Sequence, residues 1–211
     1  MPESKQNILN GLFKTWAGEP PDRIERMPRS GSYREYYRIQ GKRKQALGVY
    51  NADKKENIAF TGFTSHFLSK KLNVPRIFGE KLENNCYLLE DLGDTTLFLK
   101  IQEERKTAGF SNNLIDIYKK VLKQLPQFQV KAREGMDFSI CYPRQAFDKQ
   151  SMLWDLSYFK YYFLKLAKIP FDEQKLEDDF HRFTGFLLQV DCDYFLYRDF
   201  QSGNIMLKDD D

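Results

Sequence analysis

The segment Tyr194-Phe-Leu-Tyr-Arg-Asp-Phe-Gln-Ser-Gly-Asn-Ile-Met-Leu207 decides the predicted fold. It places Asp199 and Asn204 in a polar loop between two apolar runs, Tyr194–Leu196 and Asn204–Leu207, which predict short strands. Strands at both ends would hold the polar side chains in one orientation. A carboxylate in such a loop can accept the proton of a substrate hydroxyl, and an amide oxygen nearby can help bind a metal ion. A capped surface turn is the simpler alternative.

Outward from this loop, the first half of the chain combines strands with helix, and the second half is mainly helical. The predicted strands are Arg23–Met27, Glu35–Ile39, Gln45–Tyr50, 74–78 and Cys86–Leu89. The predicted helices are Ser4–Trp16, 51–72, Leu97–Glu104, Asn112–Leu125, Phe147–Leu166 and Glu173–Gln189. Strands followed by helices indicate an α+β fold.

An acidic, glycine-containing break at residues 90–94 interrupts this order and predicts a hinge between two lobes. Residues 1–92 would form a nucleotide-binding lobe with a mixed or antiparallel sheet, and residues 93–211 an incomplete, mainly helical catalytic lobe. Ligand sites favour such interfaces.

Composition excludes several classes of protein. The 18 Phe and 12 Tyr residues argue against disorder, and a net charge of +3 calls for neither a nucleic acid nor a membrane partner. Three scattered cysteines and two histidines, His66 and His181, make a zinc site improbable and favour a reducing compartment. With no signal peptide or membrane span, we expect a soluble, cytoplasmic protein.

The run Arg198-Asp-Phe-Gln-Ser-Gly-Asn204 resembles the catalytic loop of the protein-kinase superfamily, with Tyr197 in place of the usual histidine. The Ile-Met-Leu that follows is closer to the aminoglycoside phosphotransferase branch, whose members phosphorylate small molecules. The resemblance implies an enzyme that uses ATP and Mg²⁺, with Asp199 as catalytic base and Asn204 as metal ligand.

Two further segments occur in the order that this family requires. Ser30, Gly31 and Ser32 stand where the family has its phosphate-covering loop, and small residues let backbone amides approach phosphates. The backbone carbonyl of Glu90 and the amide of Leu92 would bind adenine at the hinge. A hairpin turn and an edge strand ending in an acidic turn are the alternative interpretations.

The family's phosphate-binding lysine is missing from the third strand, where Tyr50 occupies its place. Glu56 is the candidate for the helix glutamate that orients such a cation, although an acid at a helix N-terminus is also favoured by the helix dipole. Lys54 or Lys55 would then reach the phosphates instead.

The run Ser-Gly-Ser-Tyr-Arg-Glu-Tyr-Tyr-Arg-Ile at residues 30–39, followed by a strand without the lysine, is similar to one subgroup of bacterial kinases. These enzymes phosphorylate the anomeric hydroxyl of cell-wall amino sugars. The resemblance extends from about Leu12 to Leu207 and implies a sugar or amino sugar as acceptor. An aminoglycoside or choline-type kinase and a catalytically inactive nucleotide-binding pseudokinase are the alternatives.

The family's second metal-binding Asp, on the strand after the loop, has no counterpart before the sequence stops at Lys208-Asp-Asp-Asp211. These acids favour a solvated hairpin tip. We therefore expect a piece of a longer protein, inactive alone, with a possible further domain. The aromatic helix Phe147–Leu166 is expected to pack in the core, with sugar stacking on Trp154 as the alternative. His66 and His181 are expected to be structural.

Overall fold

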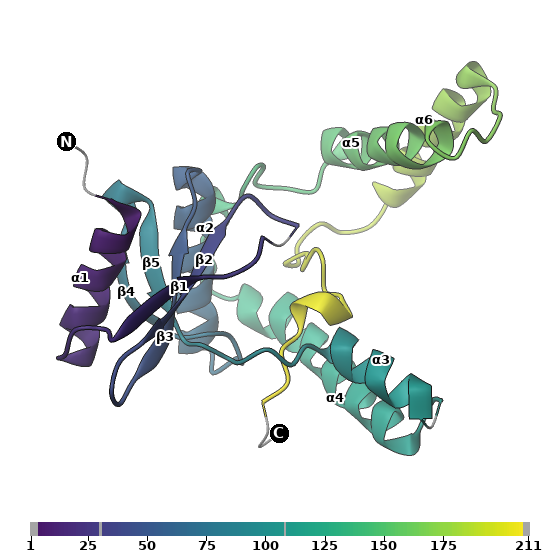
Figure 1. Ribbon diagram of the computed structural model, residues 1–211. Coiled ribbons are helices and arrows are strands. Elements are labelled where there is room, and N and C mark those ends of the chain that lie inside the picture. The colour runs from purple at the N-terminus through teal and green to yellow at the C-terminus, as the bar shows by residue number, and fades with distance from the viewer. Residues whose placement is uncertain (1–3, 30, 108, 209–211) are drawn as a thin grey trace. The chain divides into compact units, whose positions relative to one another are not determined.

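The computed structural model describes residues 4–29, 31–107 and 109–208 (Figure 1). The strands are β1 (Arg23–Arg26), β2 (Glu35–Gln40), β3 (Gln45–Tyr50), β4 (Ile77–Lys81) and β5 (Cys86–Leu89). The helices are α1 (Lys5–Ala17), α2 (Lys54–Ser69), α3 (Leu97–Thr107), α4 (Asn112–Gln129), α5 (Lys149–Phe159) and α6 (Glu173–Leu187). The predicted α+β composition is confirmed. Within the described ranges, no helix combines the length and apolar character that crossing a bilayer demands.

The five strands form one antiparallel sheet in the order β1-β2-β3-β5-β4. In the pairing of β2 with β3, Glu35 lies opposite Tyr50 and Tyr36 lies opposite Val49. Because successive side chains of a strand point to opposite faces, this register fixes which residues face α1 and which face α2.

Helix α1 covers one face of the sheet (Figure 1). Ser4 caps its start by accepting a hydrogen bond from the Asn7 amide at 3.2 Å, and Gly18 ends it with φ +77°. Leu9 and Phe13 are fully buried against the sheet. Residues of the strands complete this core: Tyr37, Ile39, Ala46, Cys86 and Leu88.

Helix α2 packs through Phe60 against the opposite face. Asp53 caps the helix by accepting hydrogen bonds from the amides of Lys55 and Glu56. The Phe60 ring stacks on Tyr87 of β5 with 5.3 Å between centroids, beside the fully buried Val49. Glu56 therefore begins a helix whose apolar side is fixed on the sheet.

Tyr50 belongs to the face covered by α1, where it packs with the core of that side and lies under the Lys5 amino group at 3.8 Å. The β3 side chains that pack with the α2-side core are Leu47 and Val49. Tyr50 therefore does not stand on the side of Glu56, and the β3 side chains that pack in the core of that side are apolar.

Helices α3 and α4 pack around a second small core, which the end of the described chain joins. Its buried members are Leu97, Ile101 and Leu114. Ile205 and Leu207 pack against them. The Leu97 amide donates to the Ile205 carbonyl at 2.8 Å, and the Leu207 amide donates to the Thr95 carbonyl at 2.9 Å.

This pairing includes a single bridge between Thr96 and Met206, so the extended run predicted at Asn204–Leu207 is shorter than expected. It is preceded by a 3₁₀ turn at Ser202–Asn204. The strand predicted at Tyr194–Leu196 is wrong: these residues have no regular structure, and Tyr194 and Leu196 are about half exposed. Apolar residues predicted the strand, but no neighbouring strand pairs with them among the described residues.

The chain divides into two compact units, residues 1–136 with 197–211, and residues 137–196. The second contains α5, a π-helical turn at Lys160–Lys165 and α6. Within it, Lys160 is nearly buried and lies 2.9 Å from Glu173 and 2.5 Å from Glu177. These ion pairs join the end of α5 to α6. The lobe boundary expected at residue 92 lies inside the first unit and stays a prediction.

Candidate functional site

Aromatic rings support the loop that contains Asp199. Tyr197 contacts Phe128 of α4 and Phe200 edge to face, each at 5.2 Å between centroids. Phe128 in turn meets Phe67 of α2 at 5.1 Å. Burial raises the pKa of Tyr197. The tyrosine in the place of the family's histidine therefore anchors the loop on α2 and α4.

Asp199 itself is exposed and has φ +54°, in the left-handed region that few non-glycine residues adopt. Three hydrogen bonds fix the loop around it. Its carbonyl accepts from the Gln201 amide at 2.8 Å and from the Asn204 side-chain nitrogen at 3.0 Å. The Asn204 amide donates to the Gln201 carbonyl at 2.8 Å. The structure thus brings the two predicted residues together.

This arrangement separates the groups that hold the loop from the groups that it leaves available. The nitrogen of the Asn204 amide is occupied by the Asp199 carbonyl, so its oxygen is left as an acceptor or metal ligand. The Asp199 carboxylate is not used in holding the loop. Left-handed strain of this kind costs about 1 kcal/mol or more, and it concentrates at functional sites.

The predicted hinge is fixed to Arg76, the residue before β4, and to the segment after the loop. The Glu90 amide donates to the Arg76 carbonyl at 2.8 Å. Its carboxylate accepts from the Lys208 amino group at 2.9 Å and from the Arg76 amide at 3.2 Å. Partial burial opposes ionisation of Glu90, but these two donors outweigh it and lower its pKa. Neither the Glu90 carbonyl nor the Leu92 amide has a backbone partner within the described residues.

Arg38 of β2 holds the other side of the hinge, a role that the sequence analysis missed. It binds Asp91 through Nε at 2.8 Å and Nη2 at 3.3 Å, and Asp94 through Nη2 at 2.8 Å and Nη1 at 3.0 Å. The hydrogen bonds from Arg38 lower the pKa of Asp94. The sequence did contain a signal for this contact, namely an arginine of β2 on the α2 side together with two acids in the hinge.

Of the predicted phosphate-covering residues, Ser30 lies outside the described residues. Gly31 and Ser32 form an exposed turn between β1 and β2. A side-chain carbon added at Gly31 would meet nothing within 4 Å. The Ser32 hydroxyl accepts a hydrogen bond from the Arg34 amide at 3.2 Å. The turn is therefore linked to the start of β2.

Glu56 pairs with Arg34 and with neither Lys54 nor Lys55, and its predicted role in orienting a phosphate-binding cation stays a prediction. Its two oxygens accept from Arg34 Nη2 at 2.8 Å and from the Asn51 amide at 2.7 Å. Lys54 and Lys55 are exposed in the first turn of α2. Sequence reasoning missed Arg34 because its partner is on a separate element.

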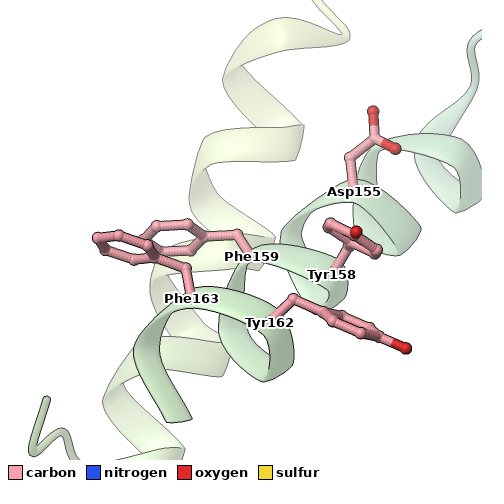
Figure 2. A pocket seen from close by; sticks show the side chains of 5 residues that line it. All are labelled: Asp155, Tyr158, Phe159, Tyr162 and Phe163. Carbon is pink, nitrogen blue, oxygen red and sulfur yellow. The ribbon is translucent and has the colours of Figure 1, made fainter. Parts of the chain in front are cut away.

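The expected burial of the aromatic helix is wrong. On α5 and the π-helical turn, many rings are about half exposed, because α6 is the helix that packs on α5 within this unit. Figure 2 shows a shallow depression on this surface. It is lined by Asp155, Tyr158, Phe159, Tyr162 and Phe163. Trp154, the candidate for sugar stacking, is half exposed and carries the Arg144 guanidinium over its ring at 5.6 Å.

The remaining candidates have limited roles. His66 donates from Nε2 to the Ala132 carbonyl at 2.6 Å, which supports its structural assignment. The structure includes Lys208 among its described residues, and the acids predicted as a hairpin tip at 209–211 lie outside them. Within the described part of the chain, no three His, Cys, Asp or Glu side chains gather as a metal cluster.

No protein-family model matches the chain. No curated protein matches it significantly. The kinase-like resemblance therefore rests on the residues and contacts described above.

Proposed function

We propose that this protein is an ATP-dependent phosphotransferase that acts on a hydroxyl group of a small molecule, a sugar or amino sugar. The observation that carries the proposal is the loop 199–204. Its backbone and the Asn204 side chain close around the Asp199 carbonyl, while the Asp199 carboxylate stays exposed. An acceptor hydroxyl needs a positioned, accessible base of this kind.

The loop is supported at both of its ends, and this support favours a catalytic role over a simple surface turn. Tyr197 is packed on the Phe128 ring of α4, and Ile205 and Leu207 pack with α3 and α4. A surface turn needs no such support. A carboxylate held from both sides loses little freedom when substrate binds, and positioning is a large part of catalysis of phosphoryl transfer.

The donor set also fits a nucleotide with Mg²⁺. Asn204 offers an amide oxygen, and Mg²⁺ sites in phosphotransferases often use one or two protein oxygens together with substrate phosphates. The metal ion would supply charge neutralisation at the phosphates. The open turn at Gly31 and Ser32 leaves room for the phosphates, and the carbonyl of Glu90 and amide of Leu92 would bind the adenine edge.

In the proposed reaction the chain binds and orients both substrates. Asp199 accepts a hydrogen bond from the acceptor hydroxyl and takes its proton as the oxygen attacks the terminal phosphorus. The bond from that phosphorus to the bridging oxygen breaks, and the nucleoside diphosphate leaves with the electron pair. Asn204 holds the loop through its side-chain nitrogen, and its oxygen would be a ligand of the metal ion.

A phosphate-transfer assay of the full-length protein tests this function. Amino sugars, neutral sugars and aminoglycosides are offered as acceptors with ATP and Mg²⁺, and Asp199→Asn is measured beside the wild type. We expect transfer to a sugar hydroxyl that the variant loses. Full activity in the variant would remove Asp199 as the base. No transfer to any acceptor class would contradict the function.

A second candidate is a nucleotide-binding module without transfer activity. The apolar side chains of Leu47 and Val49 favour it, because β3 brings no lysine to the α2 side of the sheet. The assay separates the two: nucleotide binding without turnover in the full-length protein would favour the binding module.

A further inference from the structure

The α2 side of the sheet carries a cation that the sequence pattern did not assign. Its partner Glu56 is the residue that the kinase resemblance pairs with a strand lysine, and β3 offers Leu47 and Val49 instead. We propose that Arg34 binds the phosphate groups of the nucleotide in place of that lysine. The inference rests on the proposed function, because it names the phosphate ligand of the same site.

Strand geometry places Arg34 on the required face. Tyr36 pairs with Val49 and packs with the core under α2, whereas Glu35 pairs with Tyr50 and binds Lys5 on the α1 side. Arg34 directly precedes β2, and the alternation of side chains along the strand, continued by one residue, points it to the α2 side. The ion pair of Arg34 with Glu56 agrees with this placement.

Arg34 is held in position before any ligand binds. Glu56 accepts from Arg34 Nη2 with one oxygen and from Asn51 with the other, so the carboxylate cannot rotate freely. The guanidinium lies over the Phe60 ring at 4.9 Å, and the Arg34 side chain is 17% exposed. A cation fixed in this way loses little freedom on binding phosphate.

Hydrogen-bond donors remain unused around this guanidinium. Within the described residues, Arg34 Nε and the Tyr87 hydroxyl are buried without a hydrogen-bond partner. A guanidinium has five N–H donors in a planar fork that suits the oxygens of phosphate. Glu56 accepts from one N–H of this fork, and Tyr36 also forms a hydrogen bond with the Arg34 side chain, whereas Nε has no partner. The donors that remain call for an anionic acceptor with several oxygens.

The turn before β2 connects Arg34 with the predicted phosphate-covering residues. The Ser32 hydroxyl accepts from the Arg34 amide, and Gly31 leaves open space beside it. A phosphate under this turn would meet backbone amides and a guanidinium from one local segment. Lys54 and Lys55, by contrast, are exposed.

A purely structural ion pair between the start of β2 and α2 is the competing explanation, and the number of phosphates in the ligand distinguishes the two. Binding of ATP, ADP and adenosine to the full-length protein is measured by calorimetry with Mg²⁺. The variants are Arg34→Gln and Arg34→Lys. The matched control is Arg26→Gln, which removes an arginine paired with Glu35.

We expect Arg34→Gln to weaken ATP binding about ten- to a hundred-fold, the usual effect of losing a charged hydrogen bond, and to leave adenosine binding unchanged. Arg34→Lys keeps the positive charge but not the planar fork, so its ATP affinity should lie between the affinities of Arg34→Gln and the wild type. The control should bind like the wild type. Circular dichroism checks that each variant is folded, and Arg34→Lys decides the question if Arg34→Gln does not fold.

Unchanged ATP affinity in the folded variant would overturn the assignment of Arg34. Equal losses for ATP and adenosine would also overturn it, because a structural defect predicts no dependence on phosphate. A wild-type chain that binds neither ATP nor adenosine would overturn the proposed function itself. These outcomes distinguish failure of the Arg34 assignment from failure of the proposed function.

Discussion

At the scale of single residues, Asp199 joins an uncommon backbone conformation to an exposed carboxylate. Asn adopts the left-handed region as readily as Asp, so Asp199→Asn removes the base without disturbing the turn. We expect turnover of the full-length protein to fall roughly a hundred- to ten-thousand-fold, the usual contribution of a general base. Steady-state kinetics measures the loss.

Its control is Asp116→Asn, which changes an exposed carboxylate on α4 that pairs only locally with Lys119. This variant should keep wild-type kcat and KM. A similar loss in both variants would show that the assay reports damage to folding, and a loss in neither would contradict the role of Asp199.

The second residue-scale prediction concerns Arg38. Its fork binds two carboxylates of the hinge, and the Asp91 side chain is only 3% exposed. Removing one partner of such a pair leaves a buried charge unpaired. We expect Arg38→Met to lower the free energy of unfolding by about 1 to 3 kcal/mol, measured by urea denaturation.

Arg38→Lys should recover only part of this loss, because an ammonium cannot bind both carboxylates in the same planar geometry. Arg182→Met serves as the control, since Arg182 pairs with Asp179 on an exposed helix surface. Equal stability of Arg38→Met and wild type would show that the hinge needs no such clamp.

At the scale of elements, the close approach of α1 to the sheet depends on Gly48 of β3. A side-chain carbon there would lie 2.8 Å from Ile39 Cδ1 and 3.0 Å from Leu9 Cδ1. Both neighbours are fully buried and have little room to move. We expect Gly48→Ala to destabilise the chain by about 1 to 3 kcal/mol in urea or thermal unfolding.

Gly11→Ala is the matched substitution on the partner helix. A carbon at Gly11 meets nothing within 4 Å, and alanine suits a helix interior better than glycine. This variant should be about 0.5 to 1 kcal/mol more stable than wild type. The same sign for both substitutions would contradict the packing described for α1.

Several elements could be predicted from local sequence because local chemistry defines their ends. Strands Gln45–Tyr50 and Cys86–Leu89 have the bounds that the apolar runs and adjoining turns predicted. The start of α2 follows from the capping side chain of Asp53. The pairing of Asp199 with Asn204 was also predictable, since both belong to one short loop.

Other features depend on partners far along the chain, and local patterns do not contain them. The contacts of Arg34 with Glu56 and of Arg38 with Asp91 require the register of β2 and the position of α2. Tyr194–Leu196 had the composition of a strand, but among the described residues no strand forms a ladder with this segment. The face of the sheet on which Tyr50 lies could not be predicted from local sequence, because it depends on the order of the strands.

At the scale of the whole molecule, the pair of Lys208 with Glu90 ties the segment after the loop to the hinge. The pKa of Glu90 is lowered in the folded chain, so its carboxylate stabilises folding above the usual carboxyl range, and this contribution is lost as pH falls through the lowered pKa. We expect wild type to exceed Glu90→Gln in stability by about 1 kcal/mol at pH 7.

The difference should shrink towards zero as pH falls below the usual range of a carboxyl group and through the lowered pKa of Glu90, because the carboxylate then takes up a proton. Urea denaturation of both proteins across this range measures it. Lys208→Gln should show the same loss at neutral pH. A difference that is constant with pH would mean that Glu90 acts through packing rather than charge.

The segment 205–207 packs with α3 and pairs with Thr95–Leu97, although all of residues 137–196 come between them in the chain. A ribosome therefore releases α3 and α4 long before it releases their last partner. Until that partner emerges, the apolar side chains of Leu97 and Leu114 await contacts from residues not yet synthesised, and the Asp199 loop has no anchor on its C-terminal side. Nascent chains paused within residues 137–196 would thus depend most on chaperones.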